Sequence, residues 1–65
     1  MPEVYVHVIE GKTVEQKRAL AKDITDAVVK HFAVPIEAVL VEFREARKTD
    51  KAKGGVLFSE RMPGR

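Results

Sequence analysis

The residues after the amino terminus predict a β-strand. Residues 3–9 are rich in Val, Ile and Tyr, the residue types that favour strands. One face of this strand carries Val4, Val6 and Val8, and the other carries Tyr5, His7 and Ile9. Because both faces are largely apolar, we expect a parallel sheet with both faces covered. His7, on an apolar strand, is expected to be buried with its hydrogen bonds satisfied.

A long helix is predicted over about residues 14–32. Thr13 is a suitable N-cap, and Gln16 three residues later completes a capping box. Apolar positions then recur at helical spacing on one stripe, formed by Leu20, Ile24, Ala27, Val28 and His31. We expect the helix to end before Pro35, because the residue preceding a proline is biased away from helical backbone angles.

A second strand is predicted over residues 38–45. Its faces carry Val39, Val41 and Phe43 on one side and Leu40, Glu42 and Arg44 on the other. Strand, long helix and strand indicate a βαβ unit with parallel strands. The predicted fold class is therefore α/β, with a single domain over residues 1–65.

The remainder of the chain predicts a hairpin. Residues 46–53 are interpreted as a basic loop and Gly54-Gly55 as a hairpin turn. Residues 56–58 then form a short third strand. The tail from Ser59 onward is expected to be loose unless a neighbouring subunit captures it.

The size of the chain favours self-association. A chain near 65 residues buries only about 60% of the surface that its unfolded form exposes. Small domains then rely on disulfides, a metal or oligomerisation, and the absence of cysteine excludes disulfides and thiolate metal sites. Two strands covered by one helix also leave one sheet face bare, and an exposed apolar face marks an interface. The pattern therefore predicts an oligomer without its stoichiometry.

Charge and composition exclude several function classes. The net charge of +2 is small, and basic residues mostly alternate with acidic ones, so no nucleic-acid partner is expected. No apolar run approaches the roughly 18 residues of a membrane span. No signal-peptide pattern is present, so we expect a cytoplasmic protein. We expect no metal, because two histidines without cysteine do not complete a zinc site.

The candidate catalytic group is Pro2, which directly follows Met1. Removal of Met1 would make Pro2 a terminal secondary amine. In an apolar pocket near cations the pKa of such an amine falls, and it can then act as a general base and, once protonated, as a general acid. If Met1 is retained, the nitrogen of Pro2 is a tertiary amide without basicity. Many proteins begin Met-Pro for no catalytic reason, so position alone does not establish this role.

The context of Pro2 resembles the 4-oxalocrotonate tautomerase family. The resemblance covers residues 2 to about 58 with its spacing kept throughout. It is carried by Pro2, His7, Glu10-Gly11-Lys12-Thr13, Glu15-Gln16-Lys17, Val34-Pro35, Glu45 and Gly54-Gly55. No one of these motifs is specific, but together they are hard to obtain by chance.

The resemblance implies an oligomeric isomerase. Members of this family are βαβ subunits that pair through their sheets, and three such dimers usually form a homohexamer. The amino-terminal proline shuttles a proton within a 2-hydroxydienoate or a related enol or keto acid, without a cofactor. Some relatives instead dehalogenate haloacrylates by hydration.

The substrate clamp departs from the family's pattern. Lys12 stands where an arginine usually grips the substrate carboxylate, and lysine keeps the charge but loses the bidentate fork. Leu40 stands at the position of a second arginine, and Lys51 near that of a loop aromatic. The proline base is thus retained while the clamp is altered.

Other residues are candidates for a rebuilt clamp. We hypothesise that Lys12, with Arg44 or with a lysine of the 46–53 loop, holds the carboxylate and lowers the pKa of Pro2. The alternatives are that the loop is simply solvated and that Glu42 pairs with Arg44, which would occupy this cation. Phe58 is a candidate pocket wall contributed by a neighbour. The predicted substrate-binding set is Lys12, Leu40, Arg44, Lys51 and Phe58.

Three functional hypotheses follow. The first is a tautomerase with Pro2 as the acid–base group. The second is a dehalogenase or hydratase on the same scaffold, in which Glu42 would activate water. The third is an oligomer that keeps the fold without the activity, since both the second-strand arginine and the loop aromatic are missing.

Overall fold

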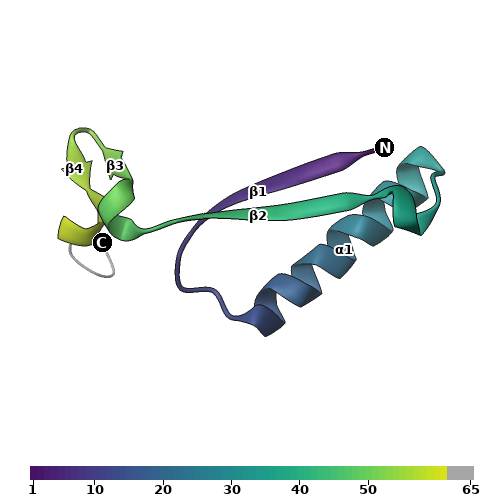
Figure 1. The fold of residues 1–65 in the computed structure, drawn as a ribbon, viewed down its shortest axis with the longest axis horizontal. Coiled ribbons are helices and arrows are strands. Elements are labelled where there is room, and N and C mark those ends of the chain that lie inside the picture. Colours follow the sequence, from purple (N-terminus) through teal and green to yellow (C-terminus); the bar gives the residue numbers. More distant parts are fainter. Residues whose placement is uncertain (62–65) are drawn as a thin grey trace.

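A computed structural model describes residues 1–61, which form a βαβ unit followed by a small hairpin (Figure 1). The main elements are β1 (Glu3–Ile9), α1 (Val14–Phe32) and β2 (Leu40–Ala46). The hairpin consists of β3 (Ala52–Lys53) and β4 (Val56–Leu57). Three 3₁₀ turns span Ile36–Ala38, Lys48–Asp50 and Phe58–Glu60. The predicted α/β class is confirmed.

β1 and β2 are parallel, as predicted. Their register runs from Glu3 opposite Leu40 to Ile9 opposite Ala46. β2 begins two residues later than predicted because Ile36–Ala38 form a 3₁₀ turn after Pro35. The N–H of Ala38 donates to the carbonyl oxygen of Pro35 at 3.0 Å, which closes this turn.

Helix α1 has the predicted bounds and capping box. The N–H of Gln16 donates to Oγ1 of Thr13 at 3.1 Å, and the N–H of Thr13 donates to Oε1 of Gln16 at 3.0 Å. At the other end Ala33 adopts a left-handed conformation with φ 56°, and its N–H donates to the carbonyl of Val29. The helix therefore ends at a left-handed cap, two residues before Pro35.

The helix face that packs toward the sheet differs from the predicted stripe. Leu20 is 43% exposed but lines a pocket against the sheet, whereas Ala27 and His31 are exposed. The half-buried helix positions are Lys17, Ala21, Ile24, Thr25, Val28 and Val29. Lys17 was absent from the predicted stripe because that stripe was chosen mainly by apolar character. A lysine can nevertheless bury its aliphatic stem while its charged end stays in water.

The two faces of the sheet have different environments. Helix α1 lies along one side of the β1–β2 sheet (Figure 1). Side chains along each strand point alternately to this covered face and to the opposite, open face. The half-buried side chains of the covered face are Val4, Val6, Val8, Val41 and Phe43. The open face carries exposed Tyr5, His7, Leu40, Glu42 and Arg44. The prediction of a buried His7 is wrong for the single chain, because no segment of residues 1–61 covers this face.

The segment after β2 extends away from the rest of the molecule (Figure 1). We call residues 1–46 the body and residues 47–61 the arm. Within the arm, β3 and β4 pair antiparallel through Gly54 and Gly55, whose φ values of 62° and 82° suit glycine. The predicted turn is thus confirmed, but the basic loop also contains a 3₁₀ turn and β3. Residues 58–60 form another 3₁₀ turn; the remaining tail lies outside the described residues.

The single chain does not enclose a core. Among residues 1–61 no side chain is fully buried. The radius of gyration is 15.2 Å, whereas a compact domain of this length has about 11 Å. No helix in the described part of the chain is long and apolar enough to cross a membrane.

Candidate active site

Pro2 lies at the amino end of β1. Its carbonyl oxygen accepts a hydrogen bond from the N–H of Leu40 at 2.9 Å, which fixes the backbone of Pro2 beside the start of β2. Pro2 is half-buried, whereas Met1 before it is 82% exposed. By strand alternation Pro2 lies on the same side of the sheet as Val4 and Val6. Removal of Met1 would therefore place a secondary amine at the edge of the covered face.

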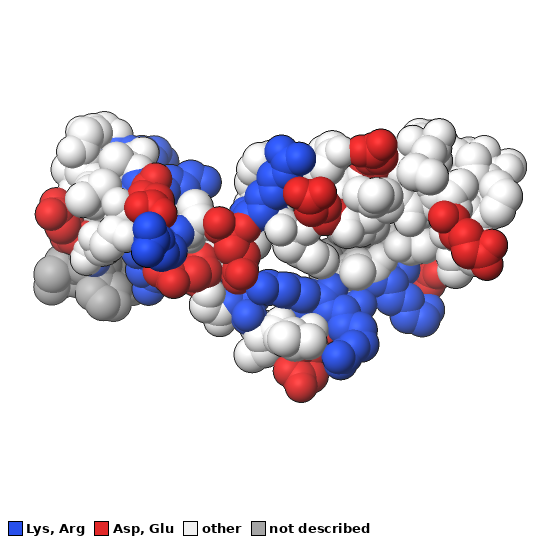
Figure 2. All heavy atoms as spheres, viewed as in Figure 1, with Lys and Arg blue, Asp and Glu red and all other residues white. Residues whose placement is uncertain are grey.

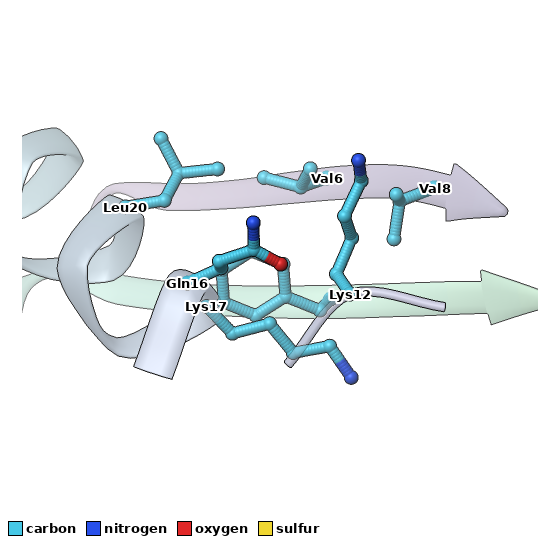
Figure 3. Close-up of a pocket in the computed structure, with 7 residues that line it drawn as sticks. Val6, Val8, Lys12, Gln16, Lys17 and Leu20 are labelled. Carbon is cyan, nitrogen blue, oxygen red and sulfur yellow. The ribbon is translucent and has the colours of Figure 1, made fainter. Parts of the chain in front are cut away.

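Lys12 lies at the opposite end of β1. The turn before it requires Gly11, whose φ of 119° is rarely adopted by residues with a side chain. Lys12 borders a pocket of about 250 Å³ between the sheet and the first half of α1. Its other lining residues are mostly apolar: Val6, Val8, Gln16, Lys17, Leu20 and Phe43. Figure 3 shows the Lys12 side chain extending alongside Val6 and Val8.

The two lysines of this pocket are not equivalent. The ammonium of Lys17 forms an ion pair with Oε2 of Glu45 at 2.9 Å, and both side chains are partly shielded. Within residues 1–61 no carboxylate lies at ion-pair distance from Lys12. Lys12 is therefore the cation of this pocket that remains available to an anionic ligand.

Arg44 lies on the open face and is held by its neighbours. Its Nε donates to Oε2 of Glu42 at 3.0 Å. Its guanidinium also stacks over the ring of Tyr5, 4.2 Å from the ring centroid. The alternative in which Glu42 occupies Arg44 is confirmed, and within one chain Arg44 and Lys12 lie on opposite sides of the sheet. Leu40, 39% exposed, is also on the open face.

Lys51 and Phe58 lie together in the arm. The Lys51 ammonium is 6.0 Å from the centroid of the Phe58 ring, and the Arg61 guanidinium is 5.7 Å from it. The N–H of Phe58 donates to the carbonyl of Lys51 at 2.8 Å. Neither residue lines the pocket of its own chain.

The structure does not bring the predicted site residues together within one chain. Pro2 and Lys12 lie beyond opposite ends of β1, which has seven residues. An extended strand of seven residues is roughly 23 Å long. Lys12 contacts the pocket, Arg44 and Leu40 lie on the open face, and Lys51 and Phe58 belong to the arm. Pro2 and Lys12 of one chain are therefore too far apart to contact the same small ligand.

The comparison with known proteins assigns the family. The family model described as "Tautomerase enzyme" matches residues 2–61. The chain belongs to the tautomerase family. It is 46% identical over 61 residues to a probable tautomerase of Bradyrhizobium diazoefficiens, covering 94% of this chain and 91% of the relative.

Solved structures of this family share the fold. A crystal structure described as a 4-oxalocrotonate tautomerase homologue superposes with a TM-score of 0.90 at 35% identity, over 95% of this chain and 98% of that one. A heterohexameric 4-oxalocrotonate tautomerase from Chloroflexus aurantiacus gives a TM-score of 0.82 at 30% identity, over 92% and 97% of the two chains. The resemblance inferred from Pro2 and the Glu10-Gly11-Lys12 segment is therefore confirmed.

Sequence reasoning missed most of the pocket. It singled out Lys12 but not the apolar wall of Val6, Val8 and Phe43, although their alternation was visible. It also gave no role to Lys17 and Glu45, whose 28-residue separation in the chain hides their ion pair.

Proposed function

We propose that this chain is a tautomerase acting on a small enol or keto acid such as a 2-hydroxydienoate. Pro2, freed by removal of Met1, is its acid–base group. The secondary amine takes the proton of the enol hydroxyl as the carbonyl forms, and the resulting ammonium returns a proton to a carbon of the conjugated system. One proton leaves oxygen and one reaches carbon, so the reaction is an isomerisation and requires no cofactor.

The observation that carries this proposal is Lys12, which has no acidic partner among residues 1–61 and lies beside an apolar pocket. An enol acid needs a cation for its carboxylate and an apolar wall for its carbon chain. Lys12 supplies the first, and Val6, Val8 and Phe43 supply the second. Because Glu45 holds Lys17, the pocket presents one available cation rather than two. An ammonium–carboxylate hydrogen bond is of the stronger, charge-assisted kind.

Self-association would complete the site. The edge of β1 that faces away from β2 is unpaired within residues 1–61. Antiparallel pairing of two β1 strands would place Pro2 of one copy near Lys12 of the other, since these residues flank opposite ends of the strand. A twofold axis would create two such sites per dimer. We propose a homohexamer of three such dimers, in keeping with the resemblance to the 4-oxalocrotonate tautomerase family.

The arm and the start of β2 would contribute further contacts. Lys51 and Phe58 do not line their own pocket, so we propose that they reach the site of a neighbouring copy. There the ring of Phe58 would add to the apolar wall and Lys51 would add positive charge. Leu40 would place an apolar side chain where the family usually has arginine, which favours a substrate with one carboxylate.

The hydratase alternative receives no support from Glu42. This carboxylate accepts a hydrogen bond from Arg44 and lies on the open face, away from Lys12. A water-activating base would need to lie beside the substrate. The tautomerase proposal therefore uses Pro2 as its only acid–base group.

The test is an ultraviolet assay of enol loss from 2-hydroxymuconate and phenylenolpyruvate. The protein must be shown by intact mass to lack Met1. We expect ketonisation above the buffer rate, and in Pro2→Ala a loss of roughly 10²–10⁴-fold in kcat/KM, the usual contribution of a positioned acid–base group. Protein that retains Met1 is the matched control, because its Pro2 nitrogen is an amide; it should be as inactive as the variant.

Two outcomes would contradict this function. Equal rates with and without Met1 would remove the amine of Pro2 from the chemistry. A folded, oligomeric protein without Met1 that does not exceed the buffer rate with either enol would favour the non-catalytic hypothesis.

A further inference from the structure

One side-chain hydrogen bond joins the arm to the body. Oε2 of Glu10 accepts from the backbone N–H of Lys48 at 3.0 Å, across 38 positions of the sequence. The N–H of Glu10 also donates to the carbonyl of Ala46, the last residue of β2, at 3.0 Å. Among residues 1–61 no other hydrogen bond or ion pair links residues 47–61 to the body. Glu10 is thus hydrogen-bonded both to Ala46, the last residue of β2, and to Lys48 in the arm.

The arm itself is tied together internally. Its first turn is closed by the N–H of Asp50, which donates to the carbonyl of Arg47 at 2.8 Å, and by an ion pair between their side chains at 3.0 Å. Arg61 donates to the carbonyl of Lys53 at 2.8 Å. The dihedral angles around Arg47 are therefore the main freedom of the arm relative to the sheet, and the Glu10–Lys48 bond restrains them.

The arm and the body carry opposite charge. Residues 47–61 contain five basic and two acidic side chains, whereas residues 1–46 contain six basic and eight acidic ones. Figure 2 shows acidic and basic groups on the visible surface of both parts, with basic groups of the body gathered in the region of α1. The net positive arm is therefore attracted to the acidic side chains of the body of a second copy, whose net charge is slightly negative.

We propose that Glu10 is a positioning residue that sets the direction of the arm through the Lys48 N–H, and thereby the approach of Lys51 and Phe58 to the site of a second copy. The expected change in KM rests on the proposed function, and the expected change in oligomer dissociation rests on self-association alone. The bond lies at the surface, so its loss changes the direction of the arm rather than the folding of the body.

The bond can be removed from either partner. Glu10→Ala removes the acceptor. Lys48→Pro removes the donor, and it suits the start of a 3₁₀ turn because Arg47, with φ −70° and ψ 151°, already has the extended conformation preferred before proline. The matched controls are Glu10→Gln, which keeps an acceptor oxygen, and Lys48→Ala, which keeps the N–H and removes the side-chain charge.

We measure KM and kcat for an enol acid and, by mass photometry or light scattering, the concentration at which the oligomer dissociates. Glu10→Ala and Lys48→Pro should both raise KM by roughly tenfold with little change in kcat, since the placement of binding groups is lost and the base is not. Both should also raise the dissociation concentration. Glu10→Gln should match the parent protein on each measure. Lys48→Ala loses one charge of the arm but keeps the hydrogen bond, so it should change each measure much less than Lys48→Pro does. Circular dichroism should show intact secondary structure in all four variants.

Several results would overturn the proposal. An effect of Glu10→Ala that Lys48→Pro does not reproduce would mean that Glu10 acts on neighbouring Lys12 and not on the arm. Failure of Glu10→Gln to preserve KM would point to charge instead of the hydrogen bond. If the parent protein has no enol activity, the proposed function fails separately, and unchanged dissociation in both bond-removing variants would then refute the role of Glu10.

Discussion

The two faces of the β1–β2 sheet carry different kinds of side chain. The covered face is apolar and half-buried under α1, with Lys12 at the border of its pocket. The open face carries a connected polar group in which Tyr5 bonds to Glu3 and stacks under Arg44, which in turn pairs with Glu42. Both faces offer a cation near an aromatic or aliphatic surface, but only on the covered face is that cation free of an acidic partner among the described residues.

The two faces are suited to different tasks, the covered face to binding a substrate and the open face to contact between copies of the chain. A substrate carboxylate at Arg44 would compete with Glu42 two residues away, whereas at Lys12 no carboxylate of residues 1–61 lies at ion-pair distance. The open face, exposed in the single chain, is suited to contact with other copies because its charges are already paired. We therefore propose that the chemistry takes place on the covered side, and that copies contact one another on the open side and at the strand edge.

The largest effect that would test this comparison is expected at Lys12. Lys12→Ala should raise KM for an enol acid about 10–100-fold, because a hydrogen bond to a charged group contributes roughly 1.5–3 kcal/mol. Lys12→Arg, which keeps the charge, should stay much closer to the parent protein. Arg44→Ala, the matched variant on the open face, should leave KM within about twofold. Steady-state kinetics that show the reverse order would move the clamp to the open face.

A mixing experiment tests whether Pro2 and Lys12 of different copies share a site. Pro2→Ala and Lys12→Ala chains are unfolded together, refolded at equal concentrations and assayed. In a twofold dimer each mixed pair regains one site with both natural residues, so about one quarter of all sites should recover. The regained activity should exceed the sum of the two separately refolded variants severalfold. No gain in samples whose mixed assembly is verified by mass would show that Pro2 and Lys12 do not act across copies.

A smaller effect is expected in the titration of Tyr5 on the open face. Its hydrogen bond to Glu3 raises the pKa of the Tyr5 hydroxyl above the ordinary tyrosine value, and burial and the Glu3 charge act in the same direction. The bond therefore contributes stability at pH values below the unfolded pKa and loses it as the pH rises through the folded pKa. Because the chain has one tyrosine and no tryptophan, ultraviolet absorbance reports Tyr5 alone. Glu3→Gln should lower the pH midpoint of the Tyr5 titration, and the control Glu37→Gln should leave this midpoint unchanged. The same midpoint in the parent protein and in both variants would contradict the Glu3 contact.

Local sequence signals predicted the elements well where one segment decides its own structure. The capping box of Thr13 and Gln16 and the glycine pair at 54–55 each act within a few residues, so their outcomes follow from local backbone chemistry. The start of β2 was less predictable, because the 3₁₀ turn after Pro35 uses residues whose composition also suits a strand. The helix stripe was wrong at Ala27 and His31, which are exposed, because spacing gives the period of a helix but not its rotation against the sheet.

The sequence by itself determined the βαβ order and the parallel pairing, and it supplied the expectation of self-association and the choice of Pro2 and Lys12 as candidates. These depend on patterns of neighbouring residues and on a family resemblance that spans most of the chain. Only the tertiary structure decided that Glu45 pairs with Lys17, that Glu42 holds Arg44 against Tyr5, and that Glu10 restrains the arm at Lys48. Which charge meets which depends on how α1, β2 and the arm are placed around the sheet, and distances across the fold are not encoded in the spacing of residues along the chain.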